Sequence, residues 1–591
     1  MIKKFQELMQ QNNFDAYIIP TADFHNSEYI CEHFKSLAYL SGFTGSAGTL
    51  VILQNEAYLW TDGRYHIQAQ IELEQTGISL MRHGLPGVPS ITEFLDSKLK
   101  DNNTLAFDGR VMSTEFVLEL KNKIKSKITL VTNVDLINGV WSERPKLPFS
   151  IIYRLDSFFS GQSYEEKLQI IRDKMTEYNT DMFILSSLED QAWLYNLRGN
   201  DIPHTPVFLS FTIITLDHTF LFVDQNKINL VIEKYLNDKE ITIRPYSDIY
   251  DFLELQKIRN ILVDFKNINY QIFSSIYKNN KLVNKQNPTI LLKAIKNETE
   301  IKNTKLAHIK DGVAFTRFMR HVKTSFQNKE EISELSLSEY LKELREKTEG
   351  YVDISFNTIC AWKEHGAMMH YSANNETNSQ IKGPGFLLVD SGGHYLEGTT
   401  DITRTLALGK MTEEMKLHFT TVLKSVIALS NAIFLKGCKG INLDILAREP
   451  IWKLLIDYKC GTGHGVGYLL SVHEPPNGFR WQIVPERNDS SVLLPGMITT
   501  NEPGIYLENK YGIRIENELL CVYKAENEFG EFLGFETITY APIDLDAINP
   551  RLLTPQEKNW INEYHKMVYN TLSEYLDMDE KEWLLKTTRE I

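Results

Sequence analysis

Cysteine is scarce in this sequence of 591 residues, and no two cysteines are spaced for a zinc–thiolate site. The thiols are odd in number and scattered, with no CxxC motif; they are Cys31, Cys360, Cys438, Cys460 and Cys521. Disulfide frameworks occur mainly in secreted proteins, with an even number of closely spaced cysteines. We therefore expect reduced thiols, a cytoplasmic protein and no thiolate-bound zinc.

Positive charge and long apolar runs are also lacking. The formal net charge is −14 at pH 7, which argues against the basic surface that nucleic-acid binding requires. No apolar run reaches the roughly 20 residues of a membrane-spanning helix. The N-terminal stretch, MIKKFQELMQQNNFDAYIIP, is polar and predicts a folded helix rather than a signal peptide. We expect neither nucleic acid nor membrane as a partner.

The chain is too long for one hydrophobic core, so we expect three domains. Residues 1–146 alternate strand-like and helical segments, and a proline-rich linker follows in WSERPKLPFS. Residues 147–290 form the second domain, and a boundary near Pro288 begins the third, residues 291–591. The predicted fold class is therefore mixed α/β (α+β).

The second domain is expected to repeat the first. TDMFILSSLEDQAWLYNLRG has the same order of acidic residue, apolar strand, acidic turn, aromatic helix and glycine as FDAYIIPTADF…LAYLSGF. TFLFVDQNK likewise resembles AYLWTDGRY. The similarity indicates tandem α/β units, with chance as the alternative.

Helices are expected at both ends of the third domain. Apolar residues recur at helical spacing from about Glu298 to Lys323. Near the C-terminus, Thr554, Pro555 and Glu557 have the order of a helix N-cap, a first-turn proline and a capping-box glutamate. We expect that last helix to pack on a domain or on a partner subunit rather than to take part in chemistry.

Five residues of the third domain have the chemistry of hard-metal ligands. They are Asp390 in LLVDSGG, Asp401 in GTTDITRT, His464 in GTGHGVG, Glu502 in NEPGIY and Glu516 in IRIENEL. If the four carboxylates converge, burying their charges is costly unless cations neutralise them. Two divalent ions supply four positive charges, and a two-metal site activates water for hydrolysis.

Each of these residues has a plainer alternative when taken alone. Asp390 ends an apolar strand, where an acid is often only a turn or cap residue. The alternation in TTDITRT places Asp401 within a strand, and the glycine-rich GGHYLEG before it permits a hairpin. GTGHGVG could be a phosphate-binding loop or a turn, although no Walker lysine follows His464. Glu516 alternates with apolar residues and could face solvent.

Taken together, the motifs resemble the pita-bread metallopeptidases. The order Asp, Asp, His, Glu, Glu and the words DSGG, TTDITRT, GTGHGVG, EPG and RIEN match that family, and in particular the long, three-domain form of aminopeptidase P. The resemblance extends to SEYI, SGFTGSAGT and WTDGRY in the first domain and to AWLYNLRG in the second. It implies two creatinase-N-terminal-like α/β domains before a pita-bread catalytic domain, and a homodimer.

The resemblance also assigns roles to the five residues. It implies two divalent metal ions, with Mn²⁺ expected and Zn²⁺ or Co²⁺ as alternatives. Asp401 and Glu516 would bridge the ions, Asp390 would complete one site, and His464 with Glu502 would complete the other. Glu502 would also be the general base for the attacking water.

Further residues match the family pattern, with one departure. His370 in GAMMHYSA and His473 in SVHEPP match catalytic histidines that bind the substrate carbonyl or move protons, with structural histidines as the alternative. Arg514 would orient a metal-ligand carboxylate without binding the metal itself. Cys460 stands where many relatives have a histidine, and a neutral thiol is a weak hydrogen-bond donor, so that role is in doubt. His365 is interpreted as a loop residue.

The expected activity is release of the first residue from peptides with proline in second position. The Xaa-Pro bond is a tertiary amide without an N–H and is resistant to general peptidases. The alternatives are a prolidase that cleaves Xaa-Pro dipeptides, a metal-free creatinase-like hydrolase and a non-catalytic binding protein of the same fold. The presence of all five candidate ligands disfavours the last two.

Overall fold

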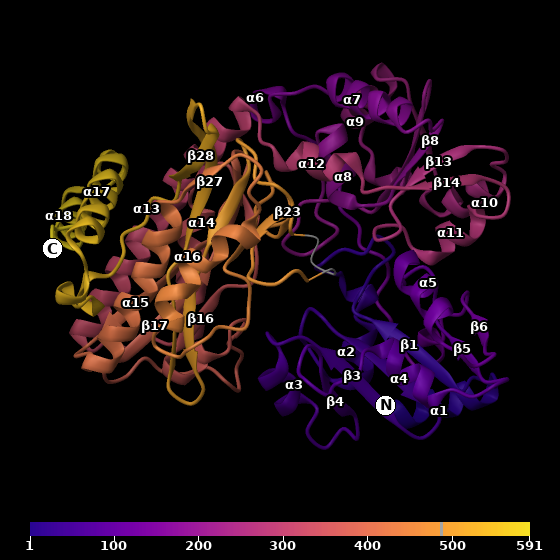
Figure 1. Cartoon of the computed structure of the whole chain (residues 1–591), viewed down its shortest axis with the longest axis horizontal. Helices are drawn as coiled ribbons and strands as arrows, with labels where there is room; N and C mark the ends of the chain where they lie inside the picture. Colours follow the sequence, from indigo (N-terminus) through magenta and orange to yellow (C-terminus); the bar gives the residue numbers. More distant parts are fainter. Residues whose placement is uncertain (485–488) are drawn as a thin grey trace. The chain divides into compact units, whose positions relative to one another are not determined.

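The computed structural model describes residues 1–484 and 489–591, which divide into two compact units. One unit comprises Met1–Asp156 and Gln162–Thr289, and the other comprises Ser157–Gly161 and Ile290–Ile591. Helices and strands are mixed throughout both units (Figure 1), as the sequence predicted. Among the described residues, no helix is both long and apolar enough to cross a membrane.

The N-terminal unit contains two six-stranded sheets of identical strand order. The first has the order β4(Ser79–Arg82)–β3(Ala57–Thr61)–β2(Thr49–Leu53)–β1(Ala16–Pro20)–β5(Thr104–Ala106)–β6(Thr129–Val131). The second has the order β12(Ile241–Arg244)–β11(Thr219–Val223)–β10(Ser210–Thr215)–β8(Met182–Leu185)–β13(Asn260–Val263)–β14(Lys281–Asn284). In both sheets the third strand pairs antiparallel with both neighbours, and the remaining pairs are parallel.

The repeat is visible in individual hydrogen bonds. Asp15, directly before β1, exchanges bonds with Thr104: its N–H donates to the Thr104 carbonyl at 2.9 Å, and its Oδ2 accepts from the Thr104 N–H at 2.7 Å. Asp181, directly before β8, exchanges the same two bonds with Asn260 at 2.9 and 3.1 Å. The prediction of two tandem α/β domains is confirmed.

Helices flank each of these sheets. Those of the first domain are α1(Ile2–Gln11), α2(Ser36–Ser41), α3(His66–Glu72), α4(Ile91–Lys98) and α5(Thr114–Lys123). Those of the second are α7(Tyr164–Glu177), α8(Leu188–Tyr195), α9(Leu230–Asp238), α10(Ile249–Glu254) and α11(Tyr270–Ile276). Two short strands, β7(Tyr153–Arg154) and β9(Leu197–Arg198), form a separate antiparallel pair. Strand β9 directly follows α8 in the order of elements. The largest buried cluster of this unit includes Ile18 and Leu105 of the first sheet and Ile184 and Ile261 of the second, so the two domains share a core.

The C-terminal unit combines several antiparallel sheets. Its largest has the order β21(Ile433–Leu435)–β28(Gly530–Thr537)–β27(Asn517–Asn527)–β24(Ile498–Asn501)–β22(Gly463–Gly465)–β23(Glu474–Phe479). Smaller sheets have the orders β16(Ile359–Trp362)–β17(Gly385–Ser391)–β20(Ile402–Leu408), β15(Tyr351–Ile354)–β18(Gly393–Tyr395)–β19(Gly398–Thr399) and β25(Gly504–Leu507)–β26(Tyr511–Arg514).

Long helices pack against these sheets (Figure 1). They are α13(Glu298–Asn328), α14(Glu334–Glu346), α15(Glu413–Ser430) and α16(Gly440–Trp452). Two further helices, α17(Pro555–Leu572) and α18(Met578–Thr587), pack on α13. The short helix α6(Ser157–Ser160) also belongs to this unit, and α12(Pro288–Ala294) contains the residues at which the chain passes from the first unit to the second. The amphipathic segment beginning at Glu298 is helical as predicted and continues to Asn328. Helix α17 begins with the predicted capping box of Thr554 and Glu557, and it packs on α13 and α15.

Two details of the ligand-bearing strands differ from the sequence prediction. Asp401 lies directly before β20 rather than within a strand, because the chain first forms the β18–β19 hairpin. The IRIENEL segment is not one continuous strand, since β26 ends at Arg514 and β27 begins at Asn517. Glu516 lies in this break and is buried, so the alternative of a solvent-facing acid is wrong.

His565 on α17 gives the fold a predictable sensitivity to acid. Its Nε2 accepts the Ile543 N–H at 3.0 Å, which requires a neutral ring nitrogen, and burial with nearby Arg404 and Arg589 lowers the pKa of His565 to about 3. An unfolded histidine has a pKa near 6.5, so between these values the unfolded chain binds a proton that the folded chain does not. Stability from this group is present above about pH 6.5 and is lost as the pH falls.

We therefore expect the advantage of the wild type over His565→Gln to shrink by up to about 1.4 kcal/mol per pH unit as the pH falls from 6 to 5. Urea unfolding of both proteins at each pH measures this difference. A difference that does not change with pH would contradict the assignment of a neutral, buried His565.

Candidate metal centre

The fold brings the five candidate ligands together from separate strands. Asp390 lies near the end of β17 and Asp401 directly before β20, and β17 pairs antiparallel with β20. His464 is the central residue of β22. Glu502 directly follows β24, which pairs with β22 and β27, and Glu516 directly precedes β27. Strand pairing thus brings these five residues, which are distant in sequence, close together in the C-terminal unit.

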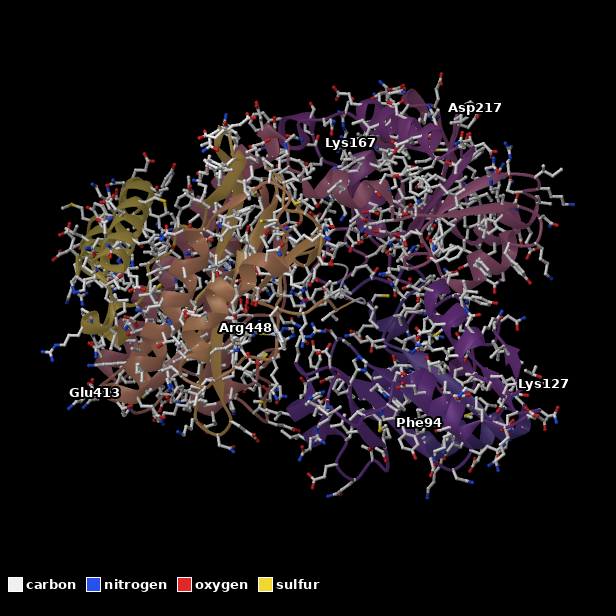
Figure 2. All side chains as sticks on the ribbon, viewed as in Figure 1. Phe94, Lys127, Lys167, Asp217, Glu413 and Arg448 are labelled. Atoms are coloured by element: carbon white, nitrogen blue, oxygen red, sulfur yellow. The ribbon has the colours of Figure 1, made fainter. Side chains whose placement is uncertain are left out.

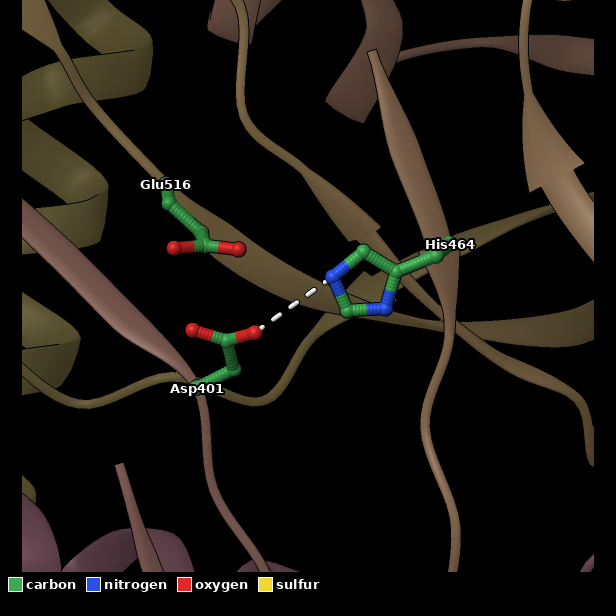
Figure 3. Close-up of side chains that lie close together, drawn as sticks. All are labelled: Asp401, His464 and Glu516. Carbon is green, nitrogen blue, oxygen red and sulfur yellow. Dashed lines mark ion pairs between the residues drawn. The ribbon is translucent and has the colours of Figure 1, made fainter. Parts of the chain in front are cut away.

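The side chains face one another at short range. Ligand atoms of Asp401, His464 and Glu516 all lie within 4.8 Å of one another, and Figure 3 shows both carboxylates directed toward the imidazole. His464 Nε2 is 3.5 Å from Asp401 Oδ2 and 3.3 Å from Glu502 Oε1. Asp390 belongs to the same cluster, because Arg514 pairs with it and also lies 4.0 Å from Glu502 Oε2. After burial, the charge of Asp390 also helps to raise the pKa of Asp401 and Glu516.

The two glycines beside His464 are required by close backbone contacts. A Cβ added to Gly463 would come within 1.8 Å of the Thr500 carbonyl oxygen, and one added to Gly465 within 2.2 Å of the Glu474 carbonyl oxygen. No larger side chain fits at either position without moving a strand. The glycines of GTGHGVG therefore allow the imidazole-bearing strand to lie tightly between its neighbours, rather than forming a phosphate loop.

A buried ion pair on α16 fixes the chain that leads into this strand. Arg448, labelled in Figure 2, pairs with Asp444 at 2.8 Å and donates to the carbonyls of Tyr458 at 2.8 Å and Cys460 at 3.2 Å. Thr462 Oγ1 donates to Asp444 Oδ1 at 2.6 Å. The segment directly before His464 is thus held by charge-assisted hydrogen bonds.

The electrostatics of the cluster call for positive charge. Burial, together with the negative charges of Asp390 and Glu502, raises the pKa of Asp401 to about 7 although His464 opposes the shift. Burial and the same neighbouring acids raise the pKa of Glu516 well above its usual range. Although burial opposes both effects, the bonds between His464 and its acids raise the pKa of His464 and lower that of Glu502. Acids crowded in this way ionise readily only when a cation accompanies them.

Carboxylate oxygens without hydrogen-bond partners indicate that the acid cluster can bind cations. Asp390 Oδ1, Asp401 Oδ1 and Glu516 Oε1 are buried, and among the described residues none of the three oxygens has a hydrogen-bond partner. Buried carboxylate oxygens without a partner are rare in folded proteins, because the loss of hydration is costly. Carboxylate oxygens with one imidazole form a ligand set suited to hard or borderline divalent ions.

Arg514 contacts two acids of this cluster, Asp390 and Glu502. Its guanidinium pairs with Asp390 Oδ2 and lies 4.0 Å from Glu502 Oε2, and it donates to the Tyr506 hydroxyl at 2.7 Å and to the Met369 carbonyl at 3.4 Å. It therefore orients one oxygen of Asp390 and leaves the other without a partner.

The two candidate catalytic histidines lie in chain segments that contact the acid cluster or Arg514. The His473 ring directly precedes β23 and lies 4.3 Å from the His464 ring, at an interplanar angle of 76°. His370 follows Met369, whose carbonyl contacts Arg514. Both histidines thus belong to segments that border the acid cluster.

Cys460 is half-buried, and burial with the nearby charge of Glu502 raises the pKa of its thiol to about 11. The thiol is therefore protonated at neutral pH and does not carry protons as an imidazole would.

We expect Cys460→Ala to change kcat by less than about tenfold. His473→Ala should instead lower kcat by roughly 10²-fold, the usual contribution of a positioned acid or base. Steady-state kinetics of the two variants make the comparison, and a larger loss in Cys460→Ala would show that the thiol has a catalytic role.

Sequence reasoning missed several groups that hold the acids in place. Glu518 is fully buried and accepts the backbone N–H of Asp401 at 2.9 Å. Thr403 Oγ1 donates to Glu516 Oε2 at 2.7 Å. The alternation of Arg514, Glu516 and Glu518 in IRIENEL was a signal for one shared face, but it does not reveal that this face is buried.

Arg404 was also missed, and it links the cluster to the C-terminal helices. It is buried and donates to the Glu516 backbone carbonyl, to Asn517 Oδ1 at 2.9 Å and to the Tyr564 hydroxyl at 2.8 Å. Tyr564 belongs to α17, so the helix expected only to pack on the domain also supports the backbone that carries Glu516.

Known families match four consecutive stretches of the chain. The Creatinase/Prolidase N-terminal domain matches residues 1–139 and, in a second form, residues 143–300. Metallopeptidase family M24 matches residues 302–522, and the C-terminal region of peptidase M24 matches residues 531–591. The matches follow the two repeated sheets and the unit that contains the acid cluster.

Full-length relatives share this organisation. Aminopeptidase P2 of Arabidopsis thaliana is 36% identical, over 97% of this chain and 86% of its own length. The probable Xaa-Pro aminopeptidase P of Coprinopsis cinerea is 36% identical, over 99% and 97%. The solved X-prolyl aminopeptidase of Caenorhabditis elegans, described as a cytosolic enzyme with a di-nuclear active site, superposes with a TM-score of 0.93 at 31% identity, over 98% of this chain and 95% of that chain.

Proposed function

This chain belongs to metallopeptidase family M24, and we propose that it is an Xaa-Pro aminopeptidase, which releases the first residue of peptides with proline in second position. The observation that carries this proposal is the convergence of four acids and one histidine, with buried carboxylate oxygens left without partners, in a chain that matches aminopeptidase P relatives end to end.

We propose that Asp390, Asp401, His464, Glu502 and Glu516 hold two divalent ions. Ligand atoms of Asp401 and Glu516 lie within 4.8 Å of each other, and beside burial the charge of Asp401 raises the pKa of Glu516. These two acids would bridge the ions, while Asp390 would complete one site and His464 with Glu502 the other. When bound, the ions would supply Lewis-acid activation of water and of the scissile carbonyl. Manganese is the proposed metal, since oxygen-rich sets suit hard ions, with zinc and cobalt as alternatives.

The protein groups have distinct tasks in this reaction. Glu502 has a lowered pKa, is ionised near neutral pH and is held by Thr500 Oγ1 at 3.0 Å, so it is the proposed general base that takes a proton from the attacking water. His370 and His473 are proposed to donate hydrogen bonds to the carbonyl oxygen as negative charge develops on it. The proline nitrogen has no hydrogen, so it has to be protonated as the peptide bond breaks. Protonated Glu502 or one of the two histidines is proposed to supply this proton.

We propose that the protein is a homodimer located in the cytoplasm. All five cysteines within the described chain are unpaired, which is compatible with a reducing compartment. The C. elegans relative is described as cytosolic. Light scattering and cell fractionation test the two expectations.

Product analysis by mass spectrometry tests the activity. Manganese-loaded protein is given an Xaa-Pro-Yaa tripeptide, an Xaa-Pro dipeptide and an Xaa-Ala-Yaa control. We expect release of only the first residue from the proline tripeptide, and loss of this activity on chelation. Cleavage of the dipeptide alone would favour a prolidase, and cleavage of the alanine control at an equal rate would contradict proline specificity.

A further inference from the structure

Glu334 is a fully buried carboxylate far from the acid cluster in sequence, at the first turn of α14. Each of its oxygens accepts two hydrogen bonds. Oε1 accepts the Trp362 N–H at 2.7 Å and lies 2.8 Å from His365 Nδ1, while Oε2 accepts the Tyr371 hydroxyl at 3.0 Å and the Ser379 N–H at 2.8 Å. Because donors face both oxygens, the side chain at position 334 has to accept hydrogen bonds at both of its terminal atoms, as an ionised carboxylate does.

The four donors belong to one segment, residues 362–379. Trp362 and Ser379 are its two ends, and His365 and Tyr371 lie within it, with their rings stacked at 4.4 Å. His370, the proposed donor to the substrate carbonyl, directly precedes Tyr371. Glu334 therefore fixes the segment on both sides of His370, through His365 on one side and Tyr371 on the other.

The same segment is packed tightly against the strand that ends in Arg514. A Cβ added to Gly512 of β26 would come within 1.7 Å of the Gly366 carbonyl oxygen, so the two backbones are in direct contact. Three residues later the Met369 carbonyl accepts from Arg514, which pairs with Asp390. The backbone on either side of His370 is thus held by Glu334, by β26 and by Arg514.

We propose that Glu334 is a positioning residue for His370, and that the hydrogen bonds of its carboxylate to His365 and Tyr371 hold the His370 segment in place against the metal centre. The inference rests on the proposed function, because His370 is taken to contact the substrate. An amide at position 334 would present N–H groups to at least one pair of donors, so it would release one side of the segment. The effect should appear in the chemical step rather than in metal binding, because no candidate ligand contacts Glu334.

The test compares Glu334→Gln with Glu343→Gln, which changes an exposed acid on the same helix, 3.9 Å from Lys347. For Glu334→Gln we expect kcat to fall roughly 10²-fold, with KM within about threefold and metal content per chain unchanged. Tyr371→Phe removes one of the four donors, and we expect a loss of about tenfold. Glu343→Gln should behave as the wild type. If Glu334→Gln does not fold, Tyr371→Phe and His365→Gln test the same claim.

A double-mutant cycle separates positioning from a general structural role. If Glu334 acts through His370, then Glu334→Gln should cost nothing further in the His370→Ala background, whereas independent effects multiply. Multiplied losses, or an unchanged kcat in folded Glu334→Gln, would overturn the inference while leaving the proposed function intact.

Hydrogen exchange distinguishes failure of the inference from failure of the proposed function. Faster exchange confined to peptides covering residues 362–379 in Glu334→Gln is expected whether or not the wild type cleaves Xaa-Pro peptides. Unchanged exchange there would overturn the positioning claim. A wild type that is inactive on these peptides would overturn the proposed function instead.

Discussion

Replacing Glu502 by alanine is expected to lower kcat on an Xaa-Pro-Yaa tripeptide by roughly 10³- to 10⁴-fold, the upper range for loss of a positioned general base. The carboxylate lies 3.3 Å from His464 Nε2 and accepts from Thr500 Oγ1 at 3.0 Å, so it is held in one orientation and kept ionised. Its removal takes away both the proposed base and one proposed metal ligand.

The control for this variant is Glu508→Ala, an exposed acid six residues later on the same stretch of chain. It should retain the wild-type kcat. Steady-state kinetics with the metal content measured on the same samples make the comparison. A loss of less than tenfold in Glu502→Ala would show that neither proposed role is correct.

The second large effect is expected at a buried ion pair that contacts the residues next to Asp390 and Asp401. Arg345 of α14 pairs with Asp311 of α13 at 2.6 Å, and both side chains are fully buried. Asp311 also accepts the hydroxyls of Tyr395 at 2.9 Å and Thr400 at 2.9 Å. Asp311→Ala would leave the guanidinium buried without its carboxylate, and breaking such a pair typically costs about 3–5 kcal/mol. Urea unfolding measures the loss.

The same substitution should weaken metal binding. Thr400 directly precedes Asp401, and Ser391, which accepts from Arg345 at 3.1 Å, directly follows Asp390. Loss of groups that orient metal ligands usually lowers metal affinity by about 10- to 100-fold. Glu346→Gln, which removes an exposed ion pair on α14, is the control, with an expected effect below about 1 kcal/mol. A loss below about 1 kcal/mol in Asp311→Ala would contradict the account of the pair.

Much of the fold was predictable because local patterns carry it. The acid before each first strand of the two N-terminal sheets makes the same pair of backbone bonds, so a weak similarity between TDMFILS and FDAYIIP reported a real repeat. The Thr554 capping box likewise depends only on residues within one turn. The five candidate ligands were found because their local words match a family, and their convergence supports that assignment.

Burial and long-range partners could not be predicted in this way. The alternation of polar and apolar residues around Glu516 does not show whether the polar face is exposed or buried. In the structure that face is buried, and Thr403 of β20 donates a hydrogen bond to the Glu516 carboxylate. The interpretation of His365 as a loop residue is wrong, because it lies in a 3-10 helix, η5(Lys363–Ala367), and contacts the Glu334 carboxylate at 2.8 Å. Glu334 lies 31 positions away in the chain, so the sequence did not reveal this partner. Such contacts depend on how helices and sheets meet, which one sequence does not specify.

The central claim is that five protein side chains hold two divalent ions. Anomalous diffraction from crystals of the manganese-loaded protein tests it directly. The account predicts two manganese peaks among Asp390, Asp401, His464, Glu502 and Glu516, with both peaks lost or weakened in Glu516→Ala. A single peak, or two peaks that persist unchanged in that variant, would contradict it.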